Sequence, residues 1–359
     1  MARRLRDLAL HAGAILGVAA LASVPSAFAR TTSGYRLLRS VALPQVTGWD
    51  YLATDAERHR LFITDNSGVL EFDTAAMRLV GPIPPHMRVR GVGMVHGVAI
   101  APALGRGYIS VEQPSSITAF DRRTRARLWS ADVDPGADAV VFEPRTRTVL
   151  SFNGKTAAVD DVGIVDAVTG ANRGAIALPG RPEAAVADDD GNVFVNIADR
   201  SEIGVIDANA HKVTALWPIG NCPEPSAMAI DKRRHLLFSA CDNKSVVMVD
   251  ARSGRVVSRA ASGDGTDAMA FDPAKDLLFV ASADGTLTIA RESDGRTLGV
   301  IDTIRTGANG RTLALDALTH HVFILTARFA ASGKPTKDNP HGYPRAIPGS
   351  VRLLVFGQS

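Results

Sequence analysis

The stretch Gly263–Val280, GDGTDAMAFDPAKDLLFV, contains the unit from which the chain is built. A Gly-rich approach leads into a short apolar run that ends at Asp272, and a tight turn separates it from a second run that starts at Leu277. Neither run can bury both of its faces by itself, so the fold requires further copies packed against this one.

Seven copies of the unit occur along the chain, and their first apolar runs start 41 to 46 residues apart. A period of about 44 residues made of short strands is typical of a propeller blade with four strands. A helical solenoid would instead show sustained helical periodicity. The seven first runs are Asp50–Asp55, His96–Ala101, Asp138–Glu143, Glu183–Asp188, Ser226–Asp231, Asp267–Asp272 and Arg311–Asp316.

The last copy shows how the ring closes. It has strand-like runs at Thr312–Leu315, Val322–Thr326 and Val351–Phe356, after which the chain ends without a fourth. Tyr35–Leu43 has the pattern of the fourth strands elsewhere and would remove the open sheet edge. The sequence therefore predicts an all-β, seven-bladed β-propeller with four-stranded antiparallel blades, in which this N-terminal strand completes the C-terminal blade.

The first 29 residues have the pattern of a signal peptide. Arg3, Arg4 and Arg6 precede the apolar run Leu8–Ala22, and Ala27-Phe28-Ala29 supplies the small residues of a cleavage site. We expect cleavage after Ala29 and a periplasmic or secreted protein whose residues 30–359 form one propeller domain. A retained N-terminal anchor is the alternative, and general or twin-arginine export both remain open.

Charge and composition argue against several partners. The chain has 40 Lys+Arg and 37 Asp+Glu, and residues 1–29 hold three Arg and one Asp, which leaves 37 against 36 after cleavage. A near-neutral chain with 6% aromatic residues is unlike the basic, aromatic groove that binds single-stranded nucleic acid. No other run approaches membrane-spanning length. We expect a monomer with no nucleic-acid partner and no membrane span after cleavage.

Several segments share a further pattern in which a strand ends in Asn or Asp and the next strand ends in Asp and a turn. It occurs in Phe194–Asn196 with Gly204–Asp207, and again in Val246–Gly254. With Cys222–Asp231 and Pro348–Val351, these segments resemble the YVTN-repeat, YncE-like β-propellers of bacterial envelopes from about residue 35 to 357. The resemblance implies an exported propeller.

The two cysteines belong to one copy of the unit. Cys222 comes just before its first strand and Cys241 ends its second, so a hairpin turning at Lys232–Arg234 brings both to one rim. In an oxidising compartment this pattern predicts a disulfide. Two free thiols or a metal site are the alternatives.

The residue that opens each first strand should lie at the mouth of the central channel, once per blade. Converging carboxylates there would raise some of their pKa values or attract a cation such as calcium. The alternative is that these groups bond loop backbone and water. The seven residues are Asp50, His96, Asp138, Glu183, Ser226, Asp267 and Arg311.

Further candidate ligand-binding residues fall at the same rim. Loops after the second strands contribute Asn153, Asn196 and Asn243, and Arg90 precedes the second copy. The long loop 330–350 contains four prolines and Tyr343, and it would either cover the mouth or decorate the surface.

Two functions are compatible with this pattern. The first is a non-catalytic binding or scaffold protein that presents its loop-rich mouth to a small ligand or an envelope protein. The alternative is a lactonase-type hydrolase, because similar propellers use mouth carboxylates and sometimes a divalent cation. Asp50, Asp138, Glu183 and Asp267 would then be metal ligands or bases, and His96 would shuttle the proton.

Overall fold

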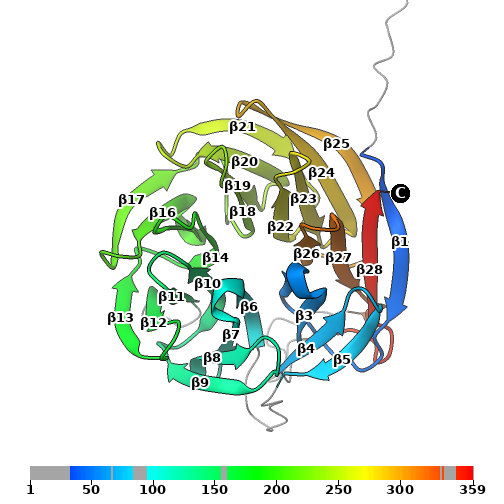
Figure 1. The fold of residues 1–359 in the computed structure, drawn as a ribbon. Coiled ribbons are helices and arrows are strands. Elements are labelled where there is room, and N and C mark those ends of the chain that lie inside the picture. Colours follow the sequence, from blue (N-terminus) through cyan, green and yellow to red (C-terminus); the bar gives the residue numbers. More distant parts are fainter. Residues whose placement is uncertain are drawn as a thin grey trace, which may run out of the picture. The chain divides into compact units, whose positions relative to one another are not determined.

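The computed structural model describes residues 33–65, 68–83, 95–154, 160–331, 334 and 345–358. These residues form seven antiparallel sheets of four strands each, arranged as blades around a ring (Figure 1). The structure thus confirms the predicted seven-bladed β-propeller. Apart from three single-turn 3-10 helices, η1 (Ala56–Arg58), η2 (Pro102–Leu104) and η3 (Ala198–Arg200), its regular elements are strands. No helix in this described part of the chain has the length and apolar character of a bilayer span.

Blades 1 to 6 follow the chain from the inner to the outer strand. Blade 1 comprises β2 (Leu52–Asp55), β3 (Arg60–Asp65), β4 (Gly68–Asp73) and β5 (Arg78–Pro82). Blade 2 comprises β6 (Val95–Ala101), β7 (Arg106–Glu112), β8 (Ser115–Asp121) and β9 (Arg127–Asp132). Blade 3 comprises β10 (Ala137–Glu143), β11 (Thr148–Asn153), β12 (Asp161–Asp166) and β13 (Asn172–Ala177). Blade 4 comprises β14 (Pro182–Ala187), β15 (Asn192–Ile197), β16 (Glu202–Asp207) and β17 (Lys212–Pro218). Blade 5 comprises β18 (Met228–Asp231), β19 (Leu236–Cys241), β20 (Ser245–Asp250) and β21 (Val256–Ala261). Blade 6 comprises β22 (Thr266–Asp272), β23 (Leu277–Ser282), β24 (Thr286–Ser293) and β25 (Thr297–Arg305).

Blade 7 joins the two ends of the described chain. It contains β26 (Leu313–Asp316), β27 (His321–Thr326), β28 (Arg352–Gln358) and, on its outer side, β1 (Tyr35–Ala42). The register runs from Tyr35 opposite Gln358 to Ala42 opposite Arg352. The N-terminal strand therefore closes the ring, as the sequence predicts, and leaves β28 without an open edge.

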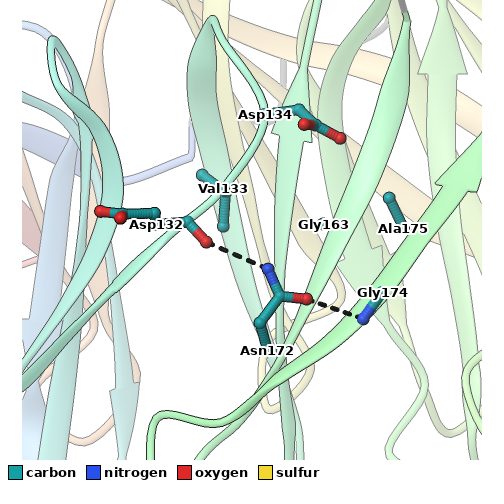
Figure 2. Close-up of a pocket in the computed structure, with 7 residues that line it drawn as sticks. All are labelled: Asp132, Val133, Asp134, Gly163, Asn172, Gly174 and Ala175. Atoms are coloured by element: carbon teal, nitrogen blue, oxygen red, sulfur yellow. Dashed lines mark hydrogen bonds between the residues drawn. The ribbon is translucent and has the colours of Figure 1, made fainter.

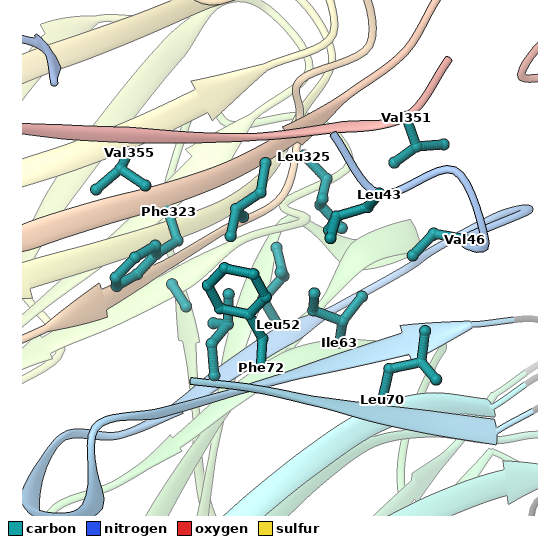
Figure 3. Packing of buried hydrophobic residues seen from close by; sticks show 13 residues of the cluster. Leu43, Val46, Leu52, Ile63, Leu70, Phe72, Phe323, Leu325, Val351 and Val355 are labelled. Atoms are coloured by element: carbon teal, nitrogen blue, oxygen red, sulfur yellow. The ribbon is translucent and has the colours of Figure 1, made fainter. Parts of the chain in front are cut away.

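Apolar side chains fill the space between the blades. The second-strand phenylalanines Phe62, Phe194, Phe238, Phe279 and Phe323 are each at most 2% exposed. Figure 3 shows one such cluster, in which Leu52, Ile63 and Phe72 of blade 1 face Phe323 and Val355 of blade 7. Each blade is thus covered by its neighbours, which explains why the inner strands are apolar nearly throughout.

The ring has two rims with different roles. We call the rim where the inner strands begin the mouth rim, and the rim where they end the opposite rim. Aspartates at the ends of the third strands cap turns on the opposite rim: Asp121 Oδ1 accepts hydrogen bonds from the backbone N–H groups of Arg123 (2.9 Å) and Thr124 (2.6 Å). These aligned aspartates are structural, because their side chains satisfy turn N–H groups.

Candidate functional site at the channel mouth

The seven residues that were expected to open the inner strands do gather at the mouth rim. His96, Asp138, Glu183 and Asp267 are the second residues of their strands, whereas Asp50, Ser226 and Arg311 come two residues before theirs. Backbone bonds join neighbouring blades at this level: Tyr51 N–H donates to His96 O (3.3 Å), Ala184 to Ser226 (3.2 Å) and Ala268 to Arg311 (3.0 Å). These bonds hold the candidate residues of adjacent blades side by side.

His96 lies at the centre of a group of three carboxylates. Its side chain is 1% exposed, and Nδ1 lies 2.6 Å from Asp50 Oδ2 and 3.2 Å from Asp138 Oδ1. The other nitrogen of the imidazole, Nε2, lies 3.1 Å from Glu112 Oε2. The sequence placed Asp50, His96 and Asp138 at one mouth, but it gave no sign that one imidazole joins carboxylates of three blades.

Glycine allows this close approach. A Cβ at Gly97 would lie 3.0 Å from Val140 Cγ1 and 3.3 Å from the carbonyl oxygen of Asp138. A side chain at this position would therefore push β6 and β10 apart. Gly97, the residue after His96, therefore allows blades 2 and 3 to pack closely at this point.

The remaining charged residues of the mouth form separate pairs. Asp267 Oδ2 lies 3.3 Å from Arg311 Nε, and Arg181 pairs with both Glu183 and Glu224. Ser226 donates its hydroxyl hydrogen to the carbonyl oxygen of Thr266 (2.7 Å). Glu183 and Asp267 therefore each have a basic partner outside the group around His96.

Tyr51 is a channel residue that the sequence analysis missed. It lines a cavity of about 180 Å³ with Asp267 and with apolar residues of other inner strands. Burial and the negative charges of Asp267, Asp138, Asp50 and Glu183 hold the pKa of its phenol well above the ordinary value, so the hydroxyl remains a neutral donor. The signal was present in the alignment: the other copies have Gly97, Ala139, Ala184, Ala227, Ala268 and Thr312 at this position.

The predicted asparagines lie in two different environments. Asn153 and Asn196 are fully buried. The Asn153 amide donates to Asp161 Oδ1 (2.6 Å), and the Asn196 amide donates to Ala227 O (3.1 Å) across blades 4 and 5. Asn243 is exposed on the mouth rim. Of the three, only Asn243 therefore offers a surface to a partner.

Two other candidates, Arg90 and Tyr343, lie outside the described residues, as do residues 1–29. For the long loop 330–350, the structure describes both ends. Ala330 N–H donates to Arg345 O (2.9 Å), and Phe329 forms a β-bridge with Ala346. The loop thus leaves and re-enters the mouth rim through a short paired base.

Cys222 and Cys241 form a disulfide in the structure, with an S–S distance of 2.03 Å. Both side chains are buried, at 0% and 3% exposure. The bond ties the segment that precedes β18 to the end of β19 at the mouth rim of blade 5.

A second hollow, of about 280 Å³, lies between the outer strands of blades 2 and 3. Figure 2 shows the Asn172 amide spanning it, donating to Asp132 O (3.1 Å) and accepting from Gly174 N–H (2.7 Å). Asp134, which also lines the hollow, shares a hydrogen bond with Asp161. Burial, followed by this contact, raises the pKa of Asp161 to about 7. The carboxyl group of Asp161 therefore keeps its proton up to about neutral pH.

Comparison with known proteins adds one family similarity. Residues 113–269, less than half of the chain, match the family model described as "Outer membrane protein assembly factor BamB". A search of curated proteins found no significant match. The middle of the chain is thus similar to an envelope-associated propeller family.

Solved structures share the fold at low sequence identity. A chain of the Kuenenia stuttgartiensis hydrazine synthase is 12% identical with a TM-score of 0.67, covering 78% of this chain and 92% of that one. A chain of a mitotic checkpoint complex is 12% identical (TM-score 0.70, 98% of both chains). U3-55K is 13% identical (TM-score 0.68, 89% and 98%). At such identities the likeness concerns the fold alone. Fold and site together define a seven-bladed propeller with a charged channel mouth.

Proposed function

We propose that this chain is an exported β-propeller of the YVTN-repeat type that binds a ligand or an envelope protein at its mouth rim, without catalysing a reaction. Four features support export and binding: the N-terminal sequence pattern, the paired cysteines, the repeat residues and the partial similarity to the BamB family. The chain would act in the periplasm or outside the cell after cleavage at Ala29.

One observation carries the binding proposal: charged side chains of several blades meet at one rim. Six carboxylates lie there beside basic partners that include His96, Arg181 and Arg311. Such a charged surface steers a ligand or partner of complementary charge toward it. The six carboxylates are those of Asp50, Glu112, Asp138, Glu183, Glu224 and Asp267.

Site-specific photo-cross-linking in cells tests this proposal. A photoreactive residue at Asn243, exposed on the mouth rim, should yield a discrete cross-linked species. A matched probe at Arg252, exposed on the opposite rim of the same blade, should yield none. Replacing Glu183 by Gln and Asp267 by Asn in the Asn243 variant should weaken the cross-link severalfold. Equal cross-linking from both rims, or insensitivity to the mouth charges, would contradict a mouth-directed protein partner. Native mass spectrometry of the purified protein would then report a small ligand.

A lactonase-type activity is the second candidate, and a different observation favours it. His96 lies within hydrogen-bond distance of carboxylates through both ring nitrogens, which brings together the residue types that hydrolases use for proton transfer. Hydrolysis of simple five- and six-membered lactones, measured by pH-stat, should then be detectable and should disappear in His96→Gln. Absence of hydrolysis in the wild-type protein would leave the binding role alone.

A further inference from the structure

Three side chains at the mouth present metal-ligating atoms to one another. A carboxylate oxygen of Asp50, a ring nitrogen of His96 and a carboxylate oxygen of Asp138 all lie within 4.8 Å of one another. We infer that these three residues bind one divalent transition-metal ion, with Zn²⁺ preferred, and that Glu112 positions the imidazole. This inference goes beyond the proposed binding role, because an ion can occupy the site whether or not a partner docks on the rim.

Counting protons on the imidazole leads to this conclusion. A neutral imidazole carries one N–H, and its other nitrogen presents a lone pair. At 2.6 Å, the contact between Nδ1 and Asp50 Oδ2 is a hydrogen bond, and Asp138 Oδ1 lies 3.2 Å from the same nitrogen. With Nε2–H donating to Glu112 (3.1 Å), a metal ion at Nδ1 would take the place of the bridging proton. The two aspartates would then hold the ion together with Nδ1.

The distances suit a small ion. Zinc lies about 2.0–2.2 Å from nitrogen and oxygen ligands, so a tetrahedral site separates its ligand atoms by roughly 3.3–3.5 Å. The separation between Asp138 and His96 already approaches this value at 3.2 Å. Asp50 starts from 2.6 Å and would withdraw by less than about 1 Å. Its side chain is 23% exposed, which leaves it room to move.

The surroundings of His96 match those of a metal ligand. Such a histidine typically donates its other N–H to a carboxylate, which fixes the tautomer and raises the basicity of the ligating nitrogen. Glu112 is placed to accept that hydrogen bond, and its backbone carbonyl in turn accepts from the Ser115 hydroxyl (2.6 Å). Three protein ligands leave a further coordination position open, as in many non-structural zinc sites.

A second cluster of acidic residues in the described part of the chain has an arginine at its centre where the mouth group has a histidine. Asp231, Asp276 and Glu292 also lie close together, but Arg234 Nη1 approaches all three, at 3.3, 2.6 and 3.1 Å. A guanidinium is permanently charged and has no lone pair to offer a metal. The mouth group has an imidazole in the corresponding place. A nitrogen ligand also disfavours calcium, which takes six to eight oxygen ligands.

Isothermal titration calorimetry of the full chain with Zn²⁺, Mn²⁺ and Ca²⁺ tests the inference. We expect one Zn²⁺ per chain, weaker binding of Mn²⁺ and no heat with Ca²⁺. Co²⁺ should bind with visible absorption bands that His96→Gln abolishes. Asp138→Asn should also abolish saturable zinc binding. Glu112→Gln should retain the ligands but lower zinc affinity by about 10- to 100-fold.

Two matched variants serve as controls. His320 makes a similar contact with Asp272 (2.7 Å) on the opposite rim, and His320→Gln should leave zinc binding unchanged. Asp267→Asn removes one mouth charge outside the triad and should change zinc affinity less than threefold. If His96→Gln fails to fold, Asp50→Asn and Asp138→Asn decide the question.

The absence of zinc binding in the wild type would overturn the inference. Undiminished one-to-one binding in the ligand variants would also overturn it. Neither result bears on cross-linking from Asn243, so a failure here is separate from a failure of the proposed function.

Discussion

Aspartates on the two rims of the ring include groups whose pKa values are shifted in opposite directions. On the opposite rim, backbone N–H groups of the turns lower the pKa of Asp73 and Asp121. At the mouth rim, burial and a neighbouring carboxyl raise the pKa of Asp161 to about 7. Nearby, three further carboxylates surround one imidazole. These carboxylates of the opposite rim therefore stabilise the fold as anions, whereas Asp161 at the mouth rim keeps its proton up to about neutral pH.

This difference separates structural charge from functional charge. The opposite rim uses each carboxylate to satisfy a turn or to bind the next blade, so removing one should destabilise the protein. The mouth rim gathers carboxylates from several blades beside basic side chains, an arrangement that is common at functional sites. The following predictions compare the rims by stability and by pH dependence.

The largest effect is expected from Arg122→Met on the opposite rim. Arg122 Nε lies 2.7 Å from Asp55 Oδ2 and joins blade 2 to blade 1, with side chains only 8% and 1% exposed. Removing one partner leaves a buried carboxylate without its counter-ion, which typically costs about 3–5 kcal/mol. Urea denaturation should report a loss of this size.

Two controls set the scale for that loss. Lys232→Gln breaks an exposed pair with Asp189 on the same rim and should change stability by less than about 1 kcal/mol. Asp267→Asn, at the mouth, should also have a small effect, because its Arg311 partner is 45% exposed. A loss below about 1 kcal/mol in Arg122→Met would remove the distinction between the rims.

The next effect concerns the disulfide at the mouth rim. Cys222 and Cys241 are 19 residues apart, and closing a loop of this length stabilises a protein by about 3 kcal/mol in the chain-entropy model. The double substitution Cys222→Ser/Cys241→Ser should lower the free energy of unfolding by roughly that amount. Unreduced wild-type protein, denatured and titrated with a thiol reagent, should show no free thiol. Two reactive thiols would show that the bond does not form in the exported chain.

The architecture was predictable because repetition supplies the same information several times. Seven copies of one unit set the blade number, and the missing fourth strand of the last copy identified β1 as the closing strand. A copy that departs from the common pattern can still be located, because the spacing of the other copies predicts where it begins.

The site was predictable in position but not in pairing. The alignment placed Asp50, His96 and Asp138 on one rim, yet their separation depends on how closely neighbouring blades pack, which Gly97 permits. Glu112 belongs to another strand of its blade, so the alignment of first strands could not associate it with His96. Arg181 likewise lies outside the aligned positions, and its pairing with Glu183 was therefore missed.

The pH dependence of stability gives the finest comparison between the rims. Asp161 has a folded-state pKa of about 7 against an ordinary value of 3.8. Between about pH 4 and 7 the folded protein thus retains a proton that the unfolded chain has released. Its contribution to stability is complete below pH 4 and declines as the pH rises to 7, by at most about 1.4 kcal/mol per pH unit. Asp161→Asn should flatten this decline.

The contribution of Asp121 to stability should depend on pH in the opposite direction. Backbone and side-chain hydrogen bonds from Thr124 lower its pKa below 3.8, so its stabilising contribution is present above pH 4 and is lost as the pH falls. Asp121→Asn should therefore destabilise the protein at pH 7 and have little effect at pH 3. Urea midpoints measured from pH 3 to 8 for the wild type and both variants test the two slopes together. Parallel profiles would mean that the two rims do not differ in charge state. Crossing profiles, with Asp161→Asn gaining on the wild type above pH 5, would show that the mouth rim holds Asp161 as a neutral acid.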